Sequence, residues 1–189
     1  RHLVLLGRCS ITTESQQAVV ERLRDQGTQV EVLTVDVSDE RALTEQWLAV
    51  SSRIPTLRGV IHAAGVLDDG LLQGQTWERF ATVLSPKVQG GWNLHRLTSN
   101  QALDFFICFS SAASVLGSLG QSNYAAANAF LDGLCAYRRQ LGLVGLSINW
   151  GPWGGSGMAS TLSSALKARM SQMGLRSLSV EQGLQTLQQ

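Results

Sequence analysis

Residues with acid–base chemistry stand at a suggestive spacing in the second half of the chain. Ser111 comes directly after an apolar run, and Tyr124 and Asn128 are four residues apart on a predicted helix, so they share one helical face. A phenol with a pKa of about 10 is a poor acid near neutral pH unless a nearby cation stabilises its anion. Lys87 is the natural candidate, because Lys167 is the only other lysine. The set predicts proton donation to a substrate oxygen held by the serine, although spacing alone leaves a purely structural tyrosine open.

The elements that must position these residues alternate along the chain. Short apolar runs predict strands at residues 2–6, 30–35, 58–63, 103–110 and 144–150. Amphipathic stretches predict helices at residues 14–26, 38–52, 76–84, 86–97, 122–141, 162–173 and 180–187. Strands that are apolar throughout are typical of parallel sheets covered on both faces. The alternation therefore predicts an α/β protein with a doubly wound parallel sheet.

Polar residues follow the first two predicted strands, at the sheet edge where doubly wound proteins bind ligands. Arg8 is suited to hold a ribose 2′-phosphate, but a surface arginine without a ligand is the alternative. Asp36, followed by Val37, also leaves two interpretations open. Its carboxylate either accepts a hydrogen bond from an adenine amino group or caps the helix that starts after Ser38.

The loops after the third and fifth predicted strands contain further candidates. His62-Ala63-Ala64-Gly65 would let a flat ligand approach the backbone closely, and equally suits a helix packed tightly on a strand. Asp68 and Asp69 form either an acid–base pair or a turn beside a glycine; the turn is favoured, and no metal is expected. Trp153 lies in the loop after the fifth strand, where it could touch a ligand. Residues 160–174 form either a lid over the substrate or a fixed surface helix.

Composition excludes several classes of protein. The 189 residues fit one domain or a large part of one, and 44% hydrophobic with 15% charged residues is typical of an ordinary globule. A net charge of +1 argues against a nucleic-acid partner, and no apolar run approaches the ~18 residues that cross a membrane. Three scattered cysteines, no metal-ligand spacing of the histidines and no secretory signal indicate a cytoplasmic protein.

Six segments, in this order and spacing, resemble the ketoreductase domain of modular polyketide synthases, a member of the short-chain dehydrogenase/reductase superfamily. The segments that carry the resemblance are His2-Leu3-Val4-Leu5-Leu6-Gly7-Arg8, Val60 to Asp69, Ser85-Pro86-Lys87-Val88-Gln89-Gly90, Phe109-Ser110-Ser111, Asn123-Tyr124-Ala125-Ala126-Ala127-Asn128 and Asn149 to Gly154. The resemblance covers essentially the whole chain and implies a Rossmann-like fold.

The resemblance implies a role for each candidate residue. The family's catalytic tetrad matches Lys87, Ser111, Tyr124 and Asn128; most other short-chain reductases place the lysine four residues after the tyrosine, where this chain has Asn128. The residues implied to bind the cofactor are Arg8, Asp36, Val37, Ala63, Ala64, Gly65, Gly151 and Pro152. Those implied to face the substrate are Leu67, Asp68, Asp69 and Trp153.

The implied reaction is reduction of a β-ketoacyl thioester to a β-hydroxyacyl thioester by NADPH. The substrate would arrive on the phosphopantetheine arm of an acyl carrier protein, beside other domains of the same synthase. Leu67-Asp68-Asp69 resembles the motif of B-type ketoreductases, and Cys108 stands where A-type domains are expected to carry tryptophan. B-type would imply a D-configured hydroxyl. The alternatives are the ketoreductase of a fatty acid synthase, a stand-alone acyl-carrier reductase, and a non-catalytic scaffold domain.

One departure from the family pattern concerns the cofactor. The family's glycine-rich dinucleotide loop should precede the first strand here, and no G-x-G-x-x-G occurs in the chain. Such a loop places backbone amides and a helix N-terminus against the pyrophosphate. Residues 1–189 are therefore expected to be a partial ketoreductase catalytic domain, an excerpt of a longer chain that starts at the family's second strand. The isolated piece is expected to be weak or inactive as an enzyme.

Overall fold

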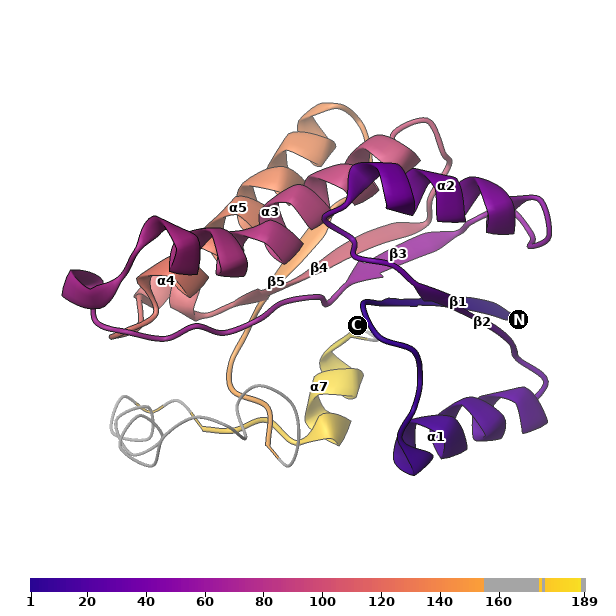
Figure 1. Ribbon diagram of the computed structural model, residues 1–189, viewed down its shortest axis with the longest axis horizontal. Helices are drawn as coiled ribbons and strands as arrows, with labels where there is room; N and C mark the ends of the chain where they lie inside the picture. The colour runs from indigo at the N-terminus through magenta and orange to yellow at the C-terminus, as the bar shows by residue number, and fades with distance from the viewer. Residues whose placement is uncertain (155–173, 175, 188–189) are drawn as a thin grey trace.

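The protein is an α/β structure with strands in the middle and helices on both sides (Figure 1). The computed structural model describes residues 1–154, 174 and 176–187. The predicted helix at 162–173 lies outside the described residues, as does nearly all of the lid candidate at 160–174.

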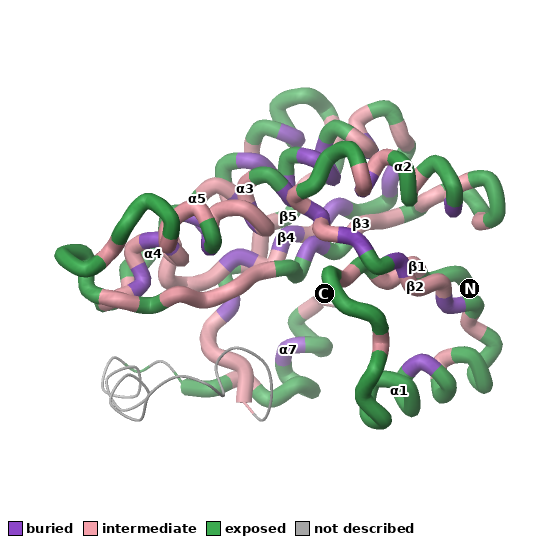
Figure 2. The backbone as a smooth tube through the Cα atoms, in the orientation of Figure 1, coloured by how far each residue is buried: buried purple, intermediate pink, exposed green. Residues whose placement is uncertain are grey.

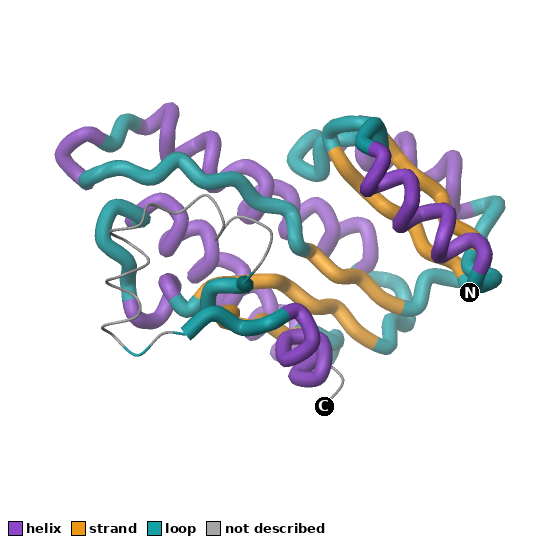
Figure 3. The backbone as a smooth tube through the Cα atoms, turned by 90° about the horizontal axis from the view of Figure 1, so that it is seen from below, coloured by secondary structure: helices purple, strands orange, loops and turns teal. Residues whose placement is uncertain are grey.

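All five predicted strands are present and parallel. They are β1 (His2–Gly7), β2 (Gln29–Thr34), β3 (Gly59–His62), β4 (Phe105–Ser111) and β5 (Leu146–Trp150). They form two sheets instead of one, with the orders β1-β2 and β3-β4-β5 (Figure 3). The hydrogen-bonded ladder is interrupted between β1 and β3. This arrangement agrees with the expected Rossmann-like α/β fold of parallel strands.

Helices cover both faces of the strands. The helical elements are α1 (Glu14–Asp25), α2 (Glu40–Ser51), the short 3₁₀ helix η1 (Leu72–Gly74), α3 (Trp77–Thr98), α4 (Ala113–Leu116), α5 (Ser122–Gln140) and α7 (Val180–Leu187). In Figure 1, α2, α3 and α5 lie above the strands, and α1 and α7 lie below them. Neither η1 nor α4 was predicted, because both are too short to show a helical period in the sequence.

Two boundaries differ from the prediction. Asp39 caps α2, because its carboxylate accepts from the amide of Ala42; Asp36 and Ser38 instead form the turn before it. The two predicted pieces at 76–84 and 86–97 are one helix, α3, which continues through Pro86. An internal proline costs a helix about 3 kcal/mol. The extensive packing of α3 on α5, with buried residues on both sides of Pro86, is the physical reason that the helix persists.

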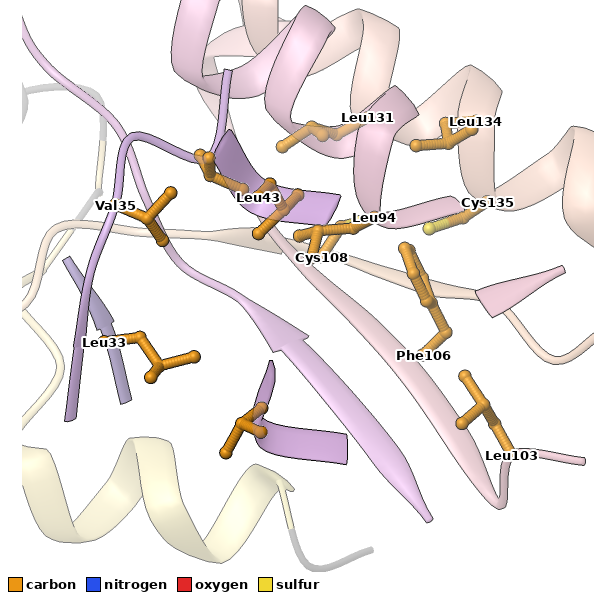
Figure 4. Packing of buried hydrophobic residues seen from close by; sticks show 12 residues of the cluster. Leu33, Val35, Leu43, Leu94, Leu103, Phe106, Cys108, Leu131, Leu134 and Cys135 are labelled. Carbon is orange, nitrogen blue, oxygen red and sulfur yellow. The ribbon is translucent and has the colours of Figure 1, made fainter. Parts of the chain in front are cut away.

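The hydrophobic core joins the two sheets. Leu33 and Val35 on the β2 side belong to the same buried cluster as Phe106 of β4 and Leu131 of α5 (Figure 4). Buried positions concentrate between the strands and the upper helices (Figure 2). Within the described residues, no helix is both long enough and apolar enough to cross a membrane.

Candidate active site

The four residues of the predicted catalytic set converge from three elements. α3 carries Lys87, the carboxyl end of β4 carries Ser111, and α5 carries Tyr124 and Asn128. The Nζ atom of Lys87 lies 5.6 Å from the centre of the Tyr124 ring. Lys87 is only 1% exposed, and its Nζ donates a hydrogen bond of 3.0 Å to the backbone carbonyl of Phe109. The fold thus brings an amine from a distant helix to the phenol.

Two adjacent glycines let α3 come close enough to its neighbours to present Lys87. A Cβ atom added at Gly91 would lie 3.0 Å from the Leu131 side chain on α5. A Cβ atom added at Gly90 would lie 2.6 Å from the Val37 side chain, which follows β2. Both glycines lie about one turn after Lys87, so this close packing fixes the part of the helix that holds the lysine.

Burial controls the charge of Lys87. Loss of hydration lowers the pKa of Lys87 to about 8, and the neighbouring Cys108 and Asp132 oppose that shift. Burial, together with the charge of Lys87, also lowers the pKa of His62 to about 4, so this histidine at the end of β3 is neutral at physiological pH. Near pH 7 the lysine is mostly protonated and close enough to its pKa to exchange a proton.

Burial acts in the opposite direction on the phenol. It raises the pKa of Tyr124, because a buried phenolate would lose hydration. The side chains of Asn128 and Ser111 beside the phenol lower this pKa, and the carboxylate of Asp69 adds to the increase. Lys87 was expected to make the phenol acidic, but the net shift is upward. Tyr124 is therefore held in its protonated form, which is the form that donates a proton.

Asn128 and Ser111 have defined partners. The side-chain amide of Asn128 donates a hydrogen bond of 2.8 Å to the backbone carbonyl of Tyr124, one turn earlier on α5. Its Oδ1 atom is buried and has no hydrogen-bond partner among the described residues. The Ser111 hydroxyl accepts from the amide of Ala113 at 3.2 Å, so its own proton is free to point elsewhere. Both side chains retain hydrogen-bonding capacity for a bound molecule or a water.

A polar network behind Ser111 was missed from the sequence. Asp132, one turn after Asn128 on α5, accepts from the hydroxyls of Ser114 and Ser147 and from the amide of Asn149 at 3.0 Å. Burial opposes ionisation of Asp132, but these hydrogen bonds lower its pKa overall. The network ties α5 to β5 and to the turn after Ser111. The four-residue spacing between Asn128 and Asp132 was the one signal in the sequence that could have pointed to Asp132. Its serine and asparagine partners come from other elements, so they leave no local pattern in the sequence.

The predicted substrate loop contacts the residues that directly precede Tyr124. Asp68 forms an ion pair with Arg79, which lowers the pKa of Asp68. Asp69 accepts a hydrogen bond of 2.9 Å from Gln121, and burial raises its pKa. The two carboxylates therefore face different partners instead of each other, and residues 63–71 form an irregular loop, not the turn that was favoured. Leu67, directly before them, is partly buried.

Arg8, Asp36 and Val37, which were predicted to bind the 2′-phosphate and adenine of the cofactor, follow the carboxyl ends of β1 and β2. Arg8 is exposed, and its charge contributes to the lowered pKa of Asp36, after the larger effect of hydrogen bonds from Ser38. The Asp36 carboxylate thus closes a turn with Ser38, whose hydroxyl donates a hydrogen bond of 2.7 Å to Oδ1 of Asp36. The Val37 side chain is buried against α3 instead of being open to a ligand.

The remaining cofactor candidates border the ends of β3 and β5. Ala63 and Ala64 are exposed and Gly65 is partly buried. Gly151 has open space where a side chain would be, with nothing within 4 Å of an added Cβ atom. Pro152 accepts a backbone hydrogen bond from Leu178. Trp153 packs in an aromatic group with Trp150 and Phe109 and covers Gly183 of α7, so its substrate contact stays a prediction.

Comparison with known proteins agrees with this geometry. The family model of the KR domain matches residues 1–155. The phenolphthiocerol synthesis polyketide synthase type I Pks15/1 of Mycobacterium marinum (strain ATCC BAA-535 / M) is 46% identical over 185 residues, which are 97% of this chain and 9% of that protein. The spectinabilin polyketide synthase system protein NorB of Streptomyces orinoci is 45% identical over 186 residues, 97% of this chain and 8% of that protein. The chain therefore spans less than a tenth of these relatives.

Solved structures show the same fold. A ketoreductase domain from the bacillaene assembly line has a TM-score of 0.90 and 36% identity, covering 98% of this chain and 46% of that one. A structure described as A-type ketoreductases from modular polyketide synthase has a TM-score of 0.89 and 35% identity, covering 99% and 39%. The match of residues 1–155, nearly the entire described α/β unit, shows that the chain belongs to the family of polyketide synthase ketoreductase (KR) domains.

Proposed function

We propose that this site reduces a β-ketoacyl thioester to a β-hydroxyacyl thioester with NADPH. Domains of this family are oxidoreductases of the short-chain dehydrogenase/reductase type that use a nicotinamide cofactor. The single observation that carries the proposal is the buried Lys87 amine 5.6 Å from the centre of the Tyr124 ring, with Ser111 and Asn128 beside the phenol. A scaffold domain would have no need to bury an ammonium group that has no ion-pair partner among the described residues, because burial of a charge is costly.

The residues present fit a nicotinamide cofactor. Gly151, open where a side chain would be, and the exposed Ala63 and Ala64 leave the strand ends accessible to a flat ring. Arg8 is exposed at the end of β1, where it would hold the 2′-phosphate and so favour NADPH over NADH. Asp36 already accepts two hydrogen bonds from Ser38, and its remaining oxygen would serve an adenine amino group.

Each residue of the site has a defined part in the chemistry. When bound, NADPH supplies the hydride that forms the new C–H bond at the β-carbon. Ser111 donates a hydrogen bond to the substrate oxygen, where negative charge develops. Tyr124 transfers its phenolic proton to that oxygen and completes the hydroxyl group. General acid catalysis of this kind contributes about 10² to 10⁴ in rate.

Lys87 and Asn128 complete the proton supply. Once Tyr124 has donated its proton, the Lys87 ammonium stabilises the phenolate and the lysine, with a pKa of about 8, supplies a replacement proton. The unpaired Oδ1 of Asn128 would accept from Lys87 or from a water that relays the proton. This role explains why an otherwise costly buried oxygen is retained.

The relatives support a proposal for the substrate and its delivery. The matched proteins are large polyketide synthases, so we propose that these residues act within such a synthase on a substrate carried by an acyl carrier protein. The Leu67-Asp68-Asp69 loop beside Tyr124 supports B-type reduction to the D-hydroxyl. The likeness to an A-type structure means that the fold does not distinguish the two types. Measured product configuration is what separates them.

Replacing each of the two tyrosines by phenylalanine tests the proposal. In the full polypeptide that contains these residues, Tyr124→Phe should lower NADPH-dependent reduction of a β-ketoacyl thioester by about 10² to 10⁴, because the acid is lost. Tyr137→Phe is the matched control, since Tyr137 lies on the same helix and is 41% exposed. Equal activity of both variants and the wild type would contradict the proposed role of Tyr124 and favour a scaffold.

A further inference from the structure

Arg79 has more hydrogen bonds to the loop beside Tyr124 than ion pairing alone requires. It lies in the first turn of α3. Its Nε and Nη2 atoms both donate to Oδ1 of Asp68, and Nη2 also donates to the backbone carbonyls of Asp68 and of Asp69, the latter at 2.7 Å. Its Nη1 donates to the carbonyl of Gly74 at 3.2 Å. One guanidinium thus connects both ends of residues 68–74.

The same loop is attached directly to the chain that precedes Tyr124. The amide of Gly70 donates to the carbonyl of Gly120 at 2.7 Å, and Gln121 donates to the Asp69 carboxylate at 2.9 Å. Asn123, which is fully buried, donates to the Asp68 carbonyl at 2.8 Å. Residues 68–74 are therefore held between Arg79 on one side and residues 120–123 on the other.

The fit around the guanidinium is specific for arginine. A Cβ atom added at Gly70 would lie 2.7 Å from Nη1 and 2.9 Å from Nη2 of Arg79, so the loop backbone lies close against the guanidinium. Two donors on one carboxylate oxygen and further donors on three carbonyls require a planar, forked group. A lysine ammonium has a single nitrogen and would reach only part of this set.

We propose that Arg79 is a positioning residue that fixes the Asp68–Gly74 loop as a rigid wall beside Tyr124 and thereby sets the orientation in which the ketone reaches the phenol. The proposal rests on the proposed reductase function. Asp69 is close enough to raise the pKa of Tyr124, which places the loop next to the reacting group. A wall that moves would let the acyl chain enter in more than one orientation. A displacement of about 1 Å is enough to cost up to about 10² in rate.

The test compares two arginines that form the same kind of ion pair. Arg58 also donates two hydrogen bonds to one carboxylate, that of Asp104, at 2.8 and 2.6 Å, but it lies just before β3, at the end of the strands opposite Tyr124. Arg79→Gln and the control Arg58→Gln would be made in the full polypeptide that contains these residues. The substrate is a racemic α-methyl-β-ketoacyl thioester with NADPH. The readouts are kcat, KM and the ratio of the hydroxyl configurations in the product.

For Arg79→Gln we expect KM to rise and kcat/KM to fall about 10-fold to 100-fold, with a loss of at least about tenfold in the configuration ratio. Arg58→Gln should leave all three values within about twofold of wild type. Arg79→Lys keeps the positive charge and replaces Arg79→Gln as the test variant if the glutamine variant does not fold. The folded lysine variant should show the same loss in the configuration ratio, because lysine cannot form the full set of hydrogen bonds. A merely structural role would lower the amount of active enzyme without changing KM or the ratio.

The failure of each idea has a different signature. If the wild type reduces the substrate and folded Arg79 variants keep the wild-type KM and configuration ratio, the positioning role is overturned and the reductase function stands. If the wild-type polypeptide transfers no hydride, the proposed function and the inference built on it are both overturned.

Discussion

Burial acts on Lys87 and Tyr124 by the same mechanism and shifts their pKa values in opposite directions. Removal of water disfavours the charged form of each group, so the pKa of the lysine falls to about 8 and that of the phenol rises. Below pH 8 the site therefore holds a protonated phenol beside an ammonium group. In the proposed reaction, this pairing would supply a proton to the substrate and a cation for the phenolate that follows.

The pH dependence of reduction should report the lysine. The pKa of Lys87 is lowered to about 8, so the ammonium form is lost as the pH rises through that value. We expect kcat to be constant between about pH 6.5 and 7.5 and to fall about tenfold for each pH unit well above 8. A pH profile of kcat under saturating NADPH checks this. Lys87→Met should have low activity without the break near pH 8, whereas a break that persists in this variant would assign it to another group.

At the residue scale, the sequence was sufficient to predict the proposed acid–base residues, but not the residues that position them. The spacing of Tyr124 and Asn128 and the scarcity of lysine single out a set that the fold indeed brings together. Arg79 and Asp132 act through partners from other elements, so no local spacing marks them. The pKa of Tyr124 also depends on three-dimensional burial, which explains why its direction was not anticipated.

At the scale of elements, α3 matters because it presents Lys87 while packing on two neighbours. The lack of a side chain lets α3 approach Leu131 of α5 at Gly91 and Val37, in the segment after β2, at Gly90. Continuation of the helix through Pro86 keeps Lys87 in register with these glycines. Strand and helix locations were predictable from apolar periodicity, whereas continuity of α3 was not, because local propensity favours a break at proline and tertiary packing overrides it.

A pair of glycine substitutions tests the packing of α3. Gly90→Ala would place a Cβ atom 2.6 Å from the branched side chain of Val37, and we expect a loss of about 1–3 kcal/mol in the free energy of unfolding. Gly133→Ala is the control on α5, where an added Cβ atom meets nothing within 4 Å. Removal of a helical glycine there should add up to about 1 kcal/mol. Urea denaturation measures both, and a Gly90→Ala protein as stable as wild type would refute close packing at this point.

At the scale of the whole molecule, one core supports two sheets. Residues from the β2 side and from β4 and α5 share a single buried cluster, although no ladder joins β1 to β3. The proposed catalytic groups all belong to the β4 side, whereas Arg8 and Asp36 belong to the β1-β2 side. The proposed cofactor would extend across both. The expectation that residues 1–189 alone are a weak enzyme stays a prediction, based on the lack of a glycine-rich loop within them.

The fold class was predictable at this scale, but the division of the strands was not. Alternating apolar runs and amphipathic stretches indicate a parallel α/β protein, but they are compatible with any order of the strands in the sheet. Strand order and the interruption between β1 and β3 depend on pairing between distant segments, which composition and periodicity do not encode.

The most direct test of the reductase chemistry follows the hydride itself. The full polypeptide that contains these residues would be incubated with a β-ketoacyl thioester and NADPH carrying deuterium at both C4 positions, and the product analysed by mass spectrometry and NMR. We expect a β-hydroxyacyl thioester with one deuterium at the β-carbon, formed much more slowly by Tyr124→Phe. A folded wild-type protein that yields no hydroxyacyl product, or a product without deuterium at that carbon, would contradict the proposed function.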